Sequence, residues 1–168
     1  MTRWATPIAA VAAMAIAVAG CGSSKKSSAG SATSNSSSSA ASTKPAGPAV
    51  ALRKVSFGTI LTGPNGHTLY LFEKDKGIKS RCNGACAAAW MPFTAQGKPS
   101  AGAGLKPALF GTTMRSDGST QVTYGGHPLY YYIRDKAAGQ TTGEGSKAFG
   151  AEWYAVGANG KKVENEGS

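Results

Sequence analysis

The sequence predicts a mainly β fold, a small antiparallel β-sandwich or barrel built from two internal repeats with pseudo-twofold symmetry. Three observations support this prediction. A segment beginning at Gly66 recurs at Gly126, short apolar runs alternate with glycine-rich turns, and helix-forming runs are scarce. Residues 49–168 also hold 13 of the 14 aromatic side chains, enough for a core.

The repeat is clearest in its central motif. Residues 66–76 read GHTLYLFEKDK and residues 126–136 read GHPLYYYIRDK, with six of 11 positions identical. Residues 57–59 recur as 110–112, and insertions between such blocks fall at turns, as a duplicated unit tolerates. The predicted repeats therefore cover about 50–100 and 101–164.

The first repeat reads as two strands joined by a turn. The run 54–61 is β-branched and apolar, residues 63–66 (GPNG) are a strong turn signal, and 68–72 is the partner strand. The period of two places Tyr70 and Phe72 on one face of this partner strand and Leu69 and Leu71 on the other. Because both faces are apolar, we expect this strand to be covered on both sides.

The second repeat shows the same organisation. Strands are expected at 109–115 and 120–124 around a hairpin turn at 116–119, followed by strands at 129–133 and 153–156. The only helical expectation is one or two turns at 85–90, which contain Trp90, the counterpart of Trp153.

Residues 1–20 read as a signal peptide. Arg3 is followed by an apolar stretch, Ile8–Ala19, which suits a secretory signal and is too short to span a bilayer. The segment ends Val-Ala-Gly-Cys at Cys21, which resembles the lipobox of bacterial lipoproteins. That resemblance implies cleavage before Cys21 and lipidation of its sulfur and amine. The alternative is an ordinary secretory signal that ends at a cysteine.

Residues 21–48 are predicted to be the lipid anchor and a disordered Ser-rich linker. Ser is the commonest residue at positions 22–48, and none of these positions is aromatic or a large aliphatic. Such a stretch cannot bury enough apolar surface to offset the conformational entropy that is lost when a chain becomes ordered.

The charge of the chain limits its partners. The chain has 18 Lys and Arg against 8 Asp and Glu, a net charge of +10. A basic domain outside the cytoplasm does not ordinarily meet nucleic acid, so we expect no nucleic-acid partner. The expected partners are the membrane, through the lipid anchor, and anionic envelope polymers or another envelope protein. Four cations gather at Lys74, Lys76, Lys79 and Arg81, where a merely solvated surface is the default interpretation.

The paired motif resembles a known family. Its positions are Tyr70, Phe72 and Asp75, repeated as Tyr130, Tyr132 and Asp135. This pattern is similar to the secreted-repeat bacterial lipoproteins with a Tyr-x-(Phe/Trp/Tyr)-x-x-Asp motif, a family of unknown function. The resemblance implies a two-repeat architecture and a lipid-anchored location at the extracytoplasmic face of the bacterial cell membrane. Roles near envelope electron-transfer or metal systems are suspected for some members of that family.

Cys82 and Cys86 are expected to form a disulfide. With Cys21 lipidated, they are the two thiols left in an oxidising compartment. A structural bridge is favoured over a redox-active dithiol, because no Cys-x-x-Cys stands at a helix start. His67 and His127, at equivalent repeat positions, could meet as metal ligands, but no carboxylate or thiolate stands at matching spacing. No metal site and no cofactor are therefore predicted.

No catalytic residues are predicted, and we expect no enzyme. Nucleophile–base pairs, paired carboxylates and phosphate loops are missing from the sequence pattern. Asp75 and Asp135 are assigned to structure, each accepting backbone N–H groups or the Trp and Tyr donors of its own repeat. The predicted function is a lipid-anchored envelope protein with a binding or scaffolding role. The alternative is an accessory role in envelope redox, electron transfer or metal handling.

Overall fold

The structure is a computed structural model that describes residues 47–165. The predicted signal peptide, the lipidation site Cys21 and residues 21–46 of the predicted linker lie outside the described residues. Within the described part, none of the helices is long and apolar enough to cross a membrane.

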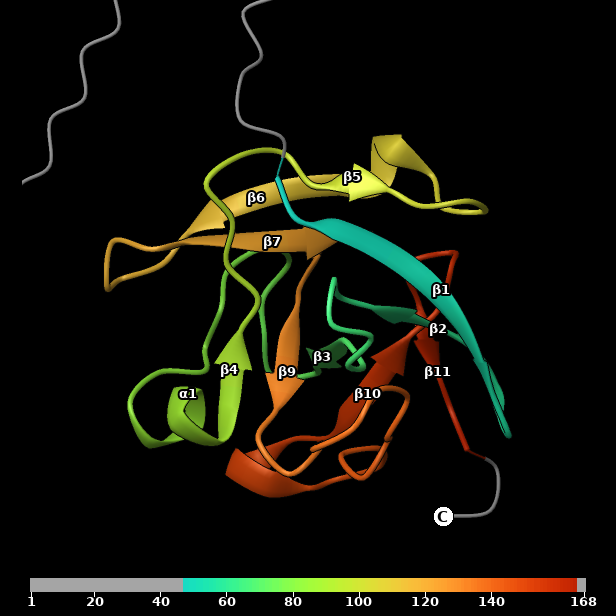
Figure 1. The fold of residues 1–168 in the computed structure, drawn as a ribbon. Helices are drawn as coiled ribbons and strands as arrows, with labels where there is room; N and C mark the ends of the chain where they lie inside the picture. Colours follow the sequence, from blue (N-terminus) through green and yellow to red (C-terminus); the bar gives the residue numbers. More distant parts are fainter. Residues whose placement is uncertain (1–46, 166–168) are drawn as a thin grey trace, which may run out of the picture. The chain divides into compact units, whose positions relative to one another are not determined.

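Strands dominate the described residues and form three sheets (Figure 1). The first sheet has the order β2-β1-β5, with β1 at Ala49–Val55, β2 at Gly58–Thr62 and β5 at Ser100–Ala101. The second has the order β11-β10-β3-β9-β4, with bounds Lys162–Val163, Trp153–Val156, Tyr70–Phe72, Tyr130–Tyr132 and Trp90–Pro92. The third has the order β6-β7-β8, at Phe110–Met114, Thr120–Tyr124 and His127–Pro128.

Helices are few in this region. The α-helix α1 spans Ala85–Ala89, as expected for the alanine-rich run, and two 3-10 helices span Pro107–Leu109 and Ala148–Gly150.

The prediction of a mainly β fold with two repeats is confirmed. The barrel alternative is wrong, because the sheets of the described residues stay open and none closes on itself.

The two repeats meet at a local twofold axis in the five-stranded sheet. Tyr70 of β3 lies directly opposite Tyr130 of β9 in an antiparallel pair, and these residues hold equivalent repeat positions. On the outer side of β3 lies β10 of the second repeat, and on the outer side of β9 lies β4 of the first. Figure 1 shows these four strands side by side. The repeats are therefore interleaved strand by strand.

The start of the first repeat differs from the prediction. The run 54–61 is not one strand, because the chain reverses at residues 56–57 and Val55 pairs with Gly58. The match of 57–59 with 110–112 is also not a structural equivalence. Leu61 and Val122 are the true counterparts, since the carbonyl of each accepts from the amide of its repeat's motif leucine, Leu69 or Leu129.

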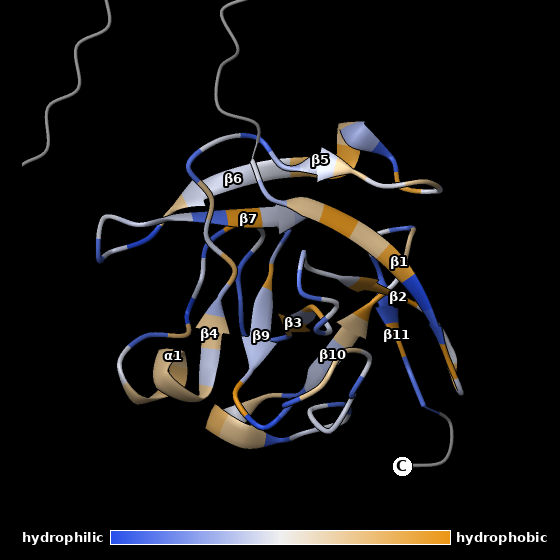
Figure 2. Cartoon of the chain, viewed as in Figure 1, coloured by the Kyte–Doolittle hydropathy of each residue, from blue (hydrophilic) through white to orange (hydrophobic). Residues whose placement is uncertain are grey.

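The core has two parts, one on each face of the motif strands. Leu69, Leu71 and Leu129 belong to one cluster, to which β1 and β7 also contribute hydrophobic residues (Figure 2). Tyr70 and Phe72 belong to the other cluster. This is the division that the period-two alternation predicted. Tyr70 and Tyr130 are both 0% exposed, as are Leu69 and Leu129, so the burial of the two repeats matches.

Candidate functional site

The motif carboxylates and tyrosines bind one another across the twofold axis. The Tyr70 hydroxyl donates to Asp135 Oδ2 at 2.7 Å, and the Tyr130 hydroxyl donates to Asp75 Oδ2 at 2.7 Å. Each aspartate thus accepts from the tyrosine of the other repeat. The expectation that each would serve the Tyr or Trp donors of its own repeat is wrong, because the antiparallel pairing of β3 and β9 places each tyrosine ring over the opposite turn.

The second oxygen of each carboxylate holds the turn that follows its strand. Asp135 Oδ1 accepts from the Thr142 amide at 2.9 Å and from the Thr142 hydroxyl at 2.5 Å. Asp75 Oδ1 accepts from the Arg81 amide at 2.7 Å. Each motif aspartate therefore joins its own turn to the other repeat, in keeping with the structural role predicted for it.

Burial sets the protonation of these groups. It raises the pKa of the Tyr70 and Tyr130 hydroxyls well above the usual range, and the acceptor carboxylates add to the rise, so both phenols stay protonated donors. Burial also raises the pKa of the Asp75 carboxyl. The hydrogen bonds from the Arg81 amide and the Tyr130 hydroxyl oppose this rise.

Four aromatic rings form one continuous stack through the axis. Phe72 stacks on Trp153 at 4.0 Å between ring centroids, Trp153 on Trp90 at 3.9 Å, and Trp90 on Tyr132 at 4.1 Å. The motif tyrosines meet the stack edge-on, Tyr70 against Trp90 at 5.3 Å and Tyr130 against Trp153 at 5.2 Å. The motif therefore builds the centre of the core.

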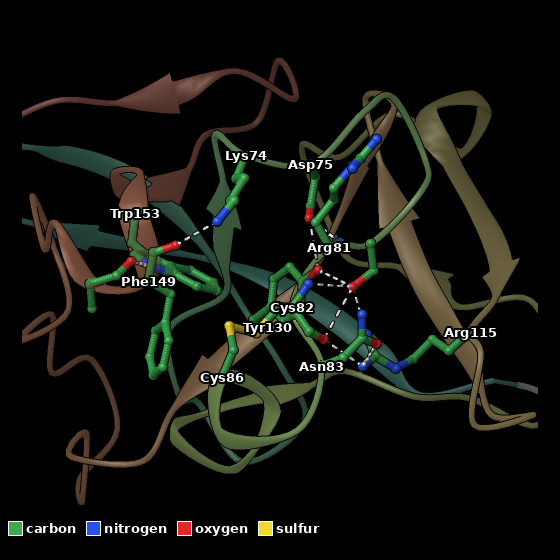
Figure 3. Close-up of a disulfide and its surroundings, with 12 residues drawn as sticks. Lys74, Asp75, Arg81, Cys82, Asn83, Cys86, Arg115, Tyr130, Phe149 and Trp153 are labelled. Carbon is green, nitrogen blue, oxygen red and sulfur yellow. Dashed lines mark hydrogen bonds between the residues drawn. A yellow bond between two sulfur atoms is a disulfide. The ribbon is translucent and has the colours of Figure 1, made fainter.

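The predicted disulfide is present. Cys82 and Cys86 are bonded, with their Cα atoms 5.1 Å apart, and they are 0% and 6% exposed. The bridge packs in the same cluster as the tryptophan stack (Figure 3). This buried position is what a structural bridge requires, since thiol–disulfide exchange needs access to a sulfur.

Arg115 is the site residue that the sequence did not reveal. Although it is 6% exposed, its guanidinium donates to the Cys82 carbonyl at 2.7 Å, to Ser80 Oγ at 2.8 Å and to Gln121 Oε1 at 2.8 Å. It also pairs with Asp117 at 3.3 Å. Arg115 thus ties the hairpin of the second repeat to the loop that carries the disulfide. Its position at a strand end beside a turn gave no signal of burial.

The loop between the motif and the disulfide, residues 74–81, carries exposed cations and is called the basic loop below. Lys74, Lys79 and Arg81 line a hollow of about 430 Å³ together with Ser80 and Asn83. Lys74 Nζ donates to the Phe149 carbonyl at 3.0 Å (Figure 3). Within the described residues, no carboxylate lies within 4.0 Å of the charged groups of Lys74, Lys76, Lys79 or Arg81.

The two histidines lie in different surroundings. The His67 ring packs edge-on against Tyr131 at 6.4 Å, whereas His127 lies beside Leu71 in a surface pocket. In residues 47–165 no group of three or more His, Cys, Asp or Glu side chains is arranged to hold a metal ion.

The geometry defines a duplicated β domain whose motif residues lock one repeat to the other, with a disulfide suited to an oxidising compartment. The family described as a secreted repeat of unknown function matches residues 52–94 and 111–157. These two segments cover more than half of the chain, and the chain belongs to this family. No curated protein and no solved structure matches it. Membership in a secreted family points to an extracytoplasmic protein.

Proposed function

We propose that this is a lipid-anchored protein of the extracytoplasmic face of the bacterial cell membrane, whose domain binds an anionic polymer of the envelope. The observation that carries this proposal is the basic loop, whose exposed cations have no carboxylate partner in the described part of the chain. Unpaired cations on a surface attract polyanions, and several together act on one polymer.

The basic loop is held in place rather than left mobile. Its end is fixed by the bond from the Arg81 amide to Asp75, and the next residues are fixed by the Cys82–Cys86 bridge and by Arg115. A loop fixed in this way loses little entropy when a ligand binds, so more of the electrostatic attraction appears as affinity.

The surrounding surface favours the same class of ligand. Residues 47–165 contain 14 Lys and Arg against seven Asp and Glu, a net charge of +7. The two motif aspartates are occupied by hydrogen bonds to the opposite repeat. Binding, rather than catalysis by a carboxylate pair, is therefore the role that we propose.

Binding is tested with the full chain in detergent micelles and two soluble polyanions, polyphosphate and polyglutamate. Changing Lys76, Lys79 and Arg81 together to Gln should weaken binding at least tenfold at low salt and reduce the salt dependence. Each lost contact should lower the log–log salt slope by about 0.7, as for flexible single-stranded polyanions.

The matched control removes three equally exposed cations elsewhere, Lys54, Lys98 and Lys106, all changed to Gln. If both triple variants lose affinity equally, the attraction is general and the basic loop is not the site. Equal binding of wild-type protein and of the loop variant would also overturn the proposal.

The redox, electron-transfer or metal-handling alternative draws less support from the described residues. The two cysteines are nearly inaccessible, and they pack beside the tryptophan stack. A redox role would require the bridge to open, so a bridge that resists mild reductants in the folded chain would count against this alternative.

A further inference from the structure

Ile78 stands at the tip of the basic loop, with cations on both sides. Its side chain is 50% exposed. Single apolar side chains on a surface are ordinary. Of the large exposed ones in residues 47–165, however, Ile78 alone has basic residues within two positions on both sides, Lys76 and Lys79. An exposed apolar side chain between cations is the combination that favours the interface of an anionic bilayer.

The fold holds this tip away from the rest of the domain. The Lys79 amide donates to the Lys76 carbonyl at 3.0 Å, and the Lys76 amide donates to the Lys79 carbonyl at 3.2 Å, which closes the turn. Gly77, beside Ile78, has a φ of +55°, which glycine adopts without strain. A Cβ placed on Gly77 would meet no atom within 4 Å. The tip is therefore preformed and accessible, so little entropy is lost when it meets a surface.

The second repeat treats the equivalent position differently. Counting from the motif aspartate, the place of Ile78 is held by Ala138. A Cβ placed on Gly66 would lie 2.9 Å from the Ala138 Cβ, and the Gly139 amide donates to the Gly66 carbonyl at 2.9 Å. That loop is packed on the domain and carries a small side chain. The exposed apolar tip is thus a feature of the first repeat and not a general result of the shared motif.

The nearby carboxylates do not cancel the charge of the tip. The two nearest in sequence are Glu73, which pairs with Lys162 at 2.9 Å, and Asp75, which accepts two hydrogen bonds from within the domain. In the part of the chain that the structure describes, no carboxylate lies within 4.0 Å of the ammonium groups of Lys76 and Lys79. Both charges remain available to anionic headgroups.

We propose that the tip of the basic loop docks the domain on a bilayer that carries anionic phospholipid. Ile78 enters the interface between headgroups and acyl chains, and Lys76 and Lys79 meet the headgroup phosphates. A soluble polyanion offers no apolar layer for Ile78, so docking on a bilayer is a property beyond the polymer binding proposed above.

The lipid anchor proposed above supplies the bilayer but does not choose the face of the domain. Cys21 and Ala49, the first residue of β1, are 28 positions apart, so the chain between them reaches at most about 100 Å. A domain of about 120 residues has a radius of gyration of about 14 Å. A tether of that reach lets any face meet the membrane, and the loop tip makes one face preferred.

The test places a fluorescent reporter at the tip of the full chain. The Ile78→Trp variant is incorporated into vesicles of phosphatidylcholine and phosphatidylglycerol, with or without bromine on the acyl chains, and the vesicle-bound chain is isolated by flotation. Bromine quenches tryptophan at contact range. Above the wild-type signal, the emission of the Ile78→Trp variant should therefore fall about twofold in brominated vesicles. In vesicles of phosphatidylcholine alone the decrease should be much smaller, because the headgroups carry no net charge.

Ile133→Trp is the matched control for position. Ile133 is 43% exposed and is followed by Arg134. The antiparallel pairing of β3 with β9 sends the loops after the two motifs out in opposite directions. The emission of the Ile133→Trp variant should therefore be the same with and without bromine.

A pair of double changes tests the charges. In the Ile78→Trp chain, Lys76→Gln with Lys79→Gln should weaken docking about 25-fold, since each cation near an anionic membrane surface contributes about fivefold. Docking is measured as quenching against the phosphatidylglycerol content of the vesicles. Lys98→Gln with Lys106→Gln, which removes two exposed cations elsewhere, should leave this curve unchanged.

Three results would overturn the docking proposal. They are an Ile78→Trp emission that bromine does not change in anionic vesicles, equal quenching of the Ile78→Trp and Ile133→Trp variants, and equal effects of the two lysine pairs.

Polymer binding is tested separately with Ile78→Ser. This change should leave the affinity for polyphosphate as it is, and a loss of affinity would assign the tip to the polymer site and overturn docking. A wild-type chain that does not bind polyphosphate would refute polymer binding without changing the quenching results, so the two proposals fail or stand separately.

Discussion

Removing one hydroxyl at the twofold axis tests how the repeats are joined. Tyr70→Phe deletes the bond to Asp135 and leaves a buried carboxylate oxygen without its donor. Hydrogen bonds to charged groups contribute about 1.5–3 kcal/mol, and we expect a loss of that size in the free energy of unfolding. For a folded part of this length, each kcal/mol lowers Tm by about 4 °C, which gives a decrease of about 6–12 °C.

A double-mutant cycle then identifies the partner. Tyr70→Phe combined with Asp135→Asn should show a coupling of about 1–3 kcal/mol, because the pair shares a buried bond. Tyr70→Phe combined with Asp75→Asn should be nearly additive, since Asp75 accepts from Tyr130 instead. The assay is urea unfolding followed by tryptophan fluorescence. A larger coupling to Asp75 than to Asp135 would refute the cross-repeat pairing. A Tyr70→Phe variant as stable as the wild type would refute the expected contribution of the Tyr70–Asp135 hydrogen bond to the free energy of unfolding.

Four further predictions concern single features. Changing both Cys82 and Cys86 to Ser should cost about 2 kcal/mol in a melt without unfolding the domain, as loop-closure entropy predicts for so short a ring. Arg115→Met should cost about 2–3 kcal/mol in urea unfolding, because buried acceptors lose their donor. Burial raises the pKa of Glu144 to about 7, so unfolding free energy should fall as pH rises from about 4.5 to 7, and Glu144→Gln should flatten this profile. Cys21→Ser should release the chain from membranes on fractionation, if acyl chains hold it there.

The sign of the pH prediction follows from the folded state. A carboxyl with a raised pKa binds its proton more tightly in the folded protein than in the unfolded chain. The contribution of Glu144 to the free energy of unfolding is therefore fully present below about pH 4.5 and is lost by about pH 7. Because Glu144 is partly exposed, solvent screening keeps the change small. Stability that rises with pH across this interval in the wild type, or an equally sloped Glu144→Gln profile, would contradict it.

Local pattern predicted the elements better than it predicted their partners. Alternation placed Leu69 and Tyr70 on opposite faces because the period of a strand does not depend on its neighbours. The same motif occurs twice, however, so the sequence alone could not say which tyrosine meets which aspartate. That choice is made by the antiparallel pairing of β3 with β9.

Two other features depended on tertiary context. The turn at residues 56–57 was missed because Val55 and residues 59–61 are strand-forming, although Gly58, directly after the turn, is itself a turn signal. The burial of Arg115 was missed because an arginine beside a hairpin turn is ordinarily exposed, and its partners in the disulfide loop and at Gln121 come together only in the folded domain.

The interleaved central sheet also has a consequence for how the two halves relate. Each half, taken alone, would present the bare edge of its motif strand and an aspartate without its tyrosine. A second copy of the same half would satisfy both, because a twofold interface is self-complementary. The domain thus has the internal geometry of a symmetric homodimer joined into one chain, and within one chain the surfaces away from the axis need not be identical.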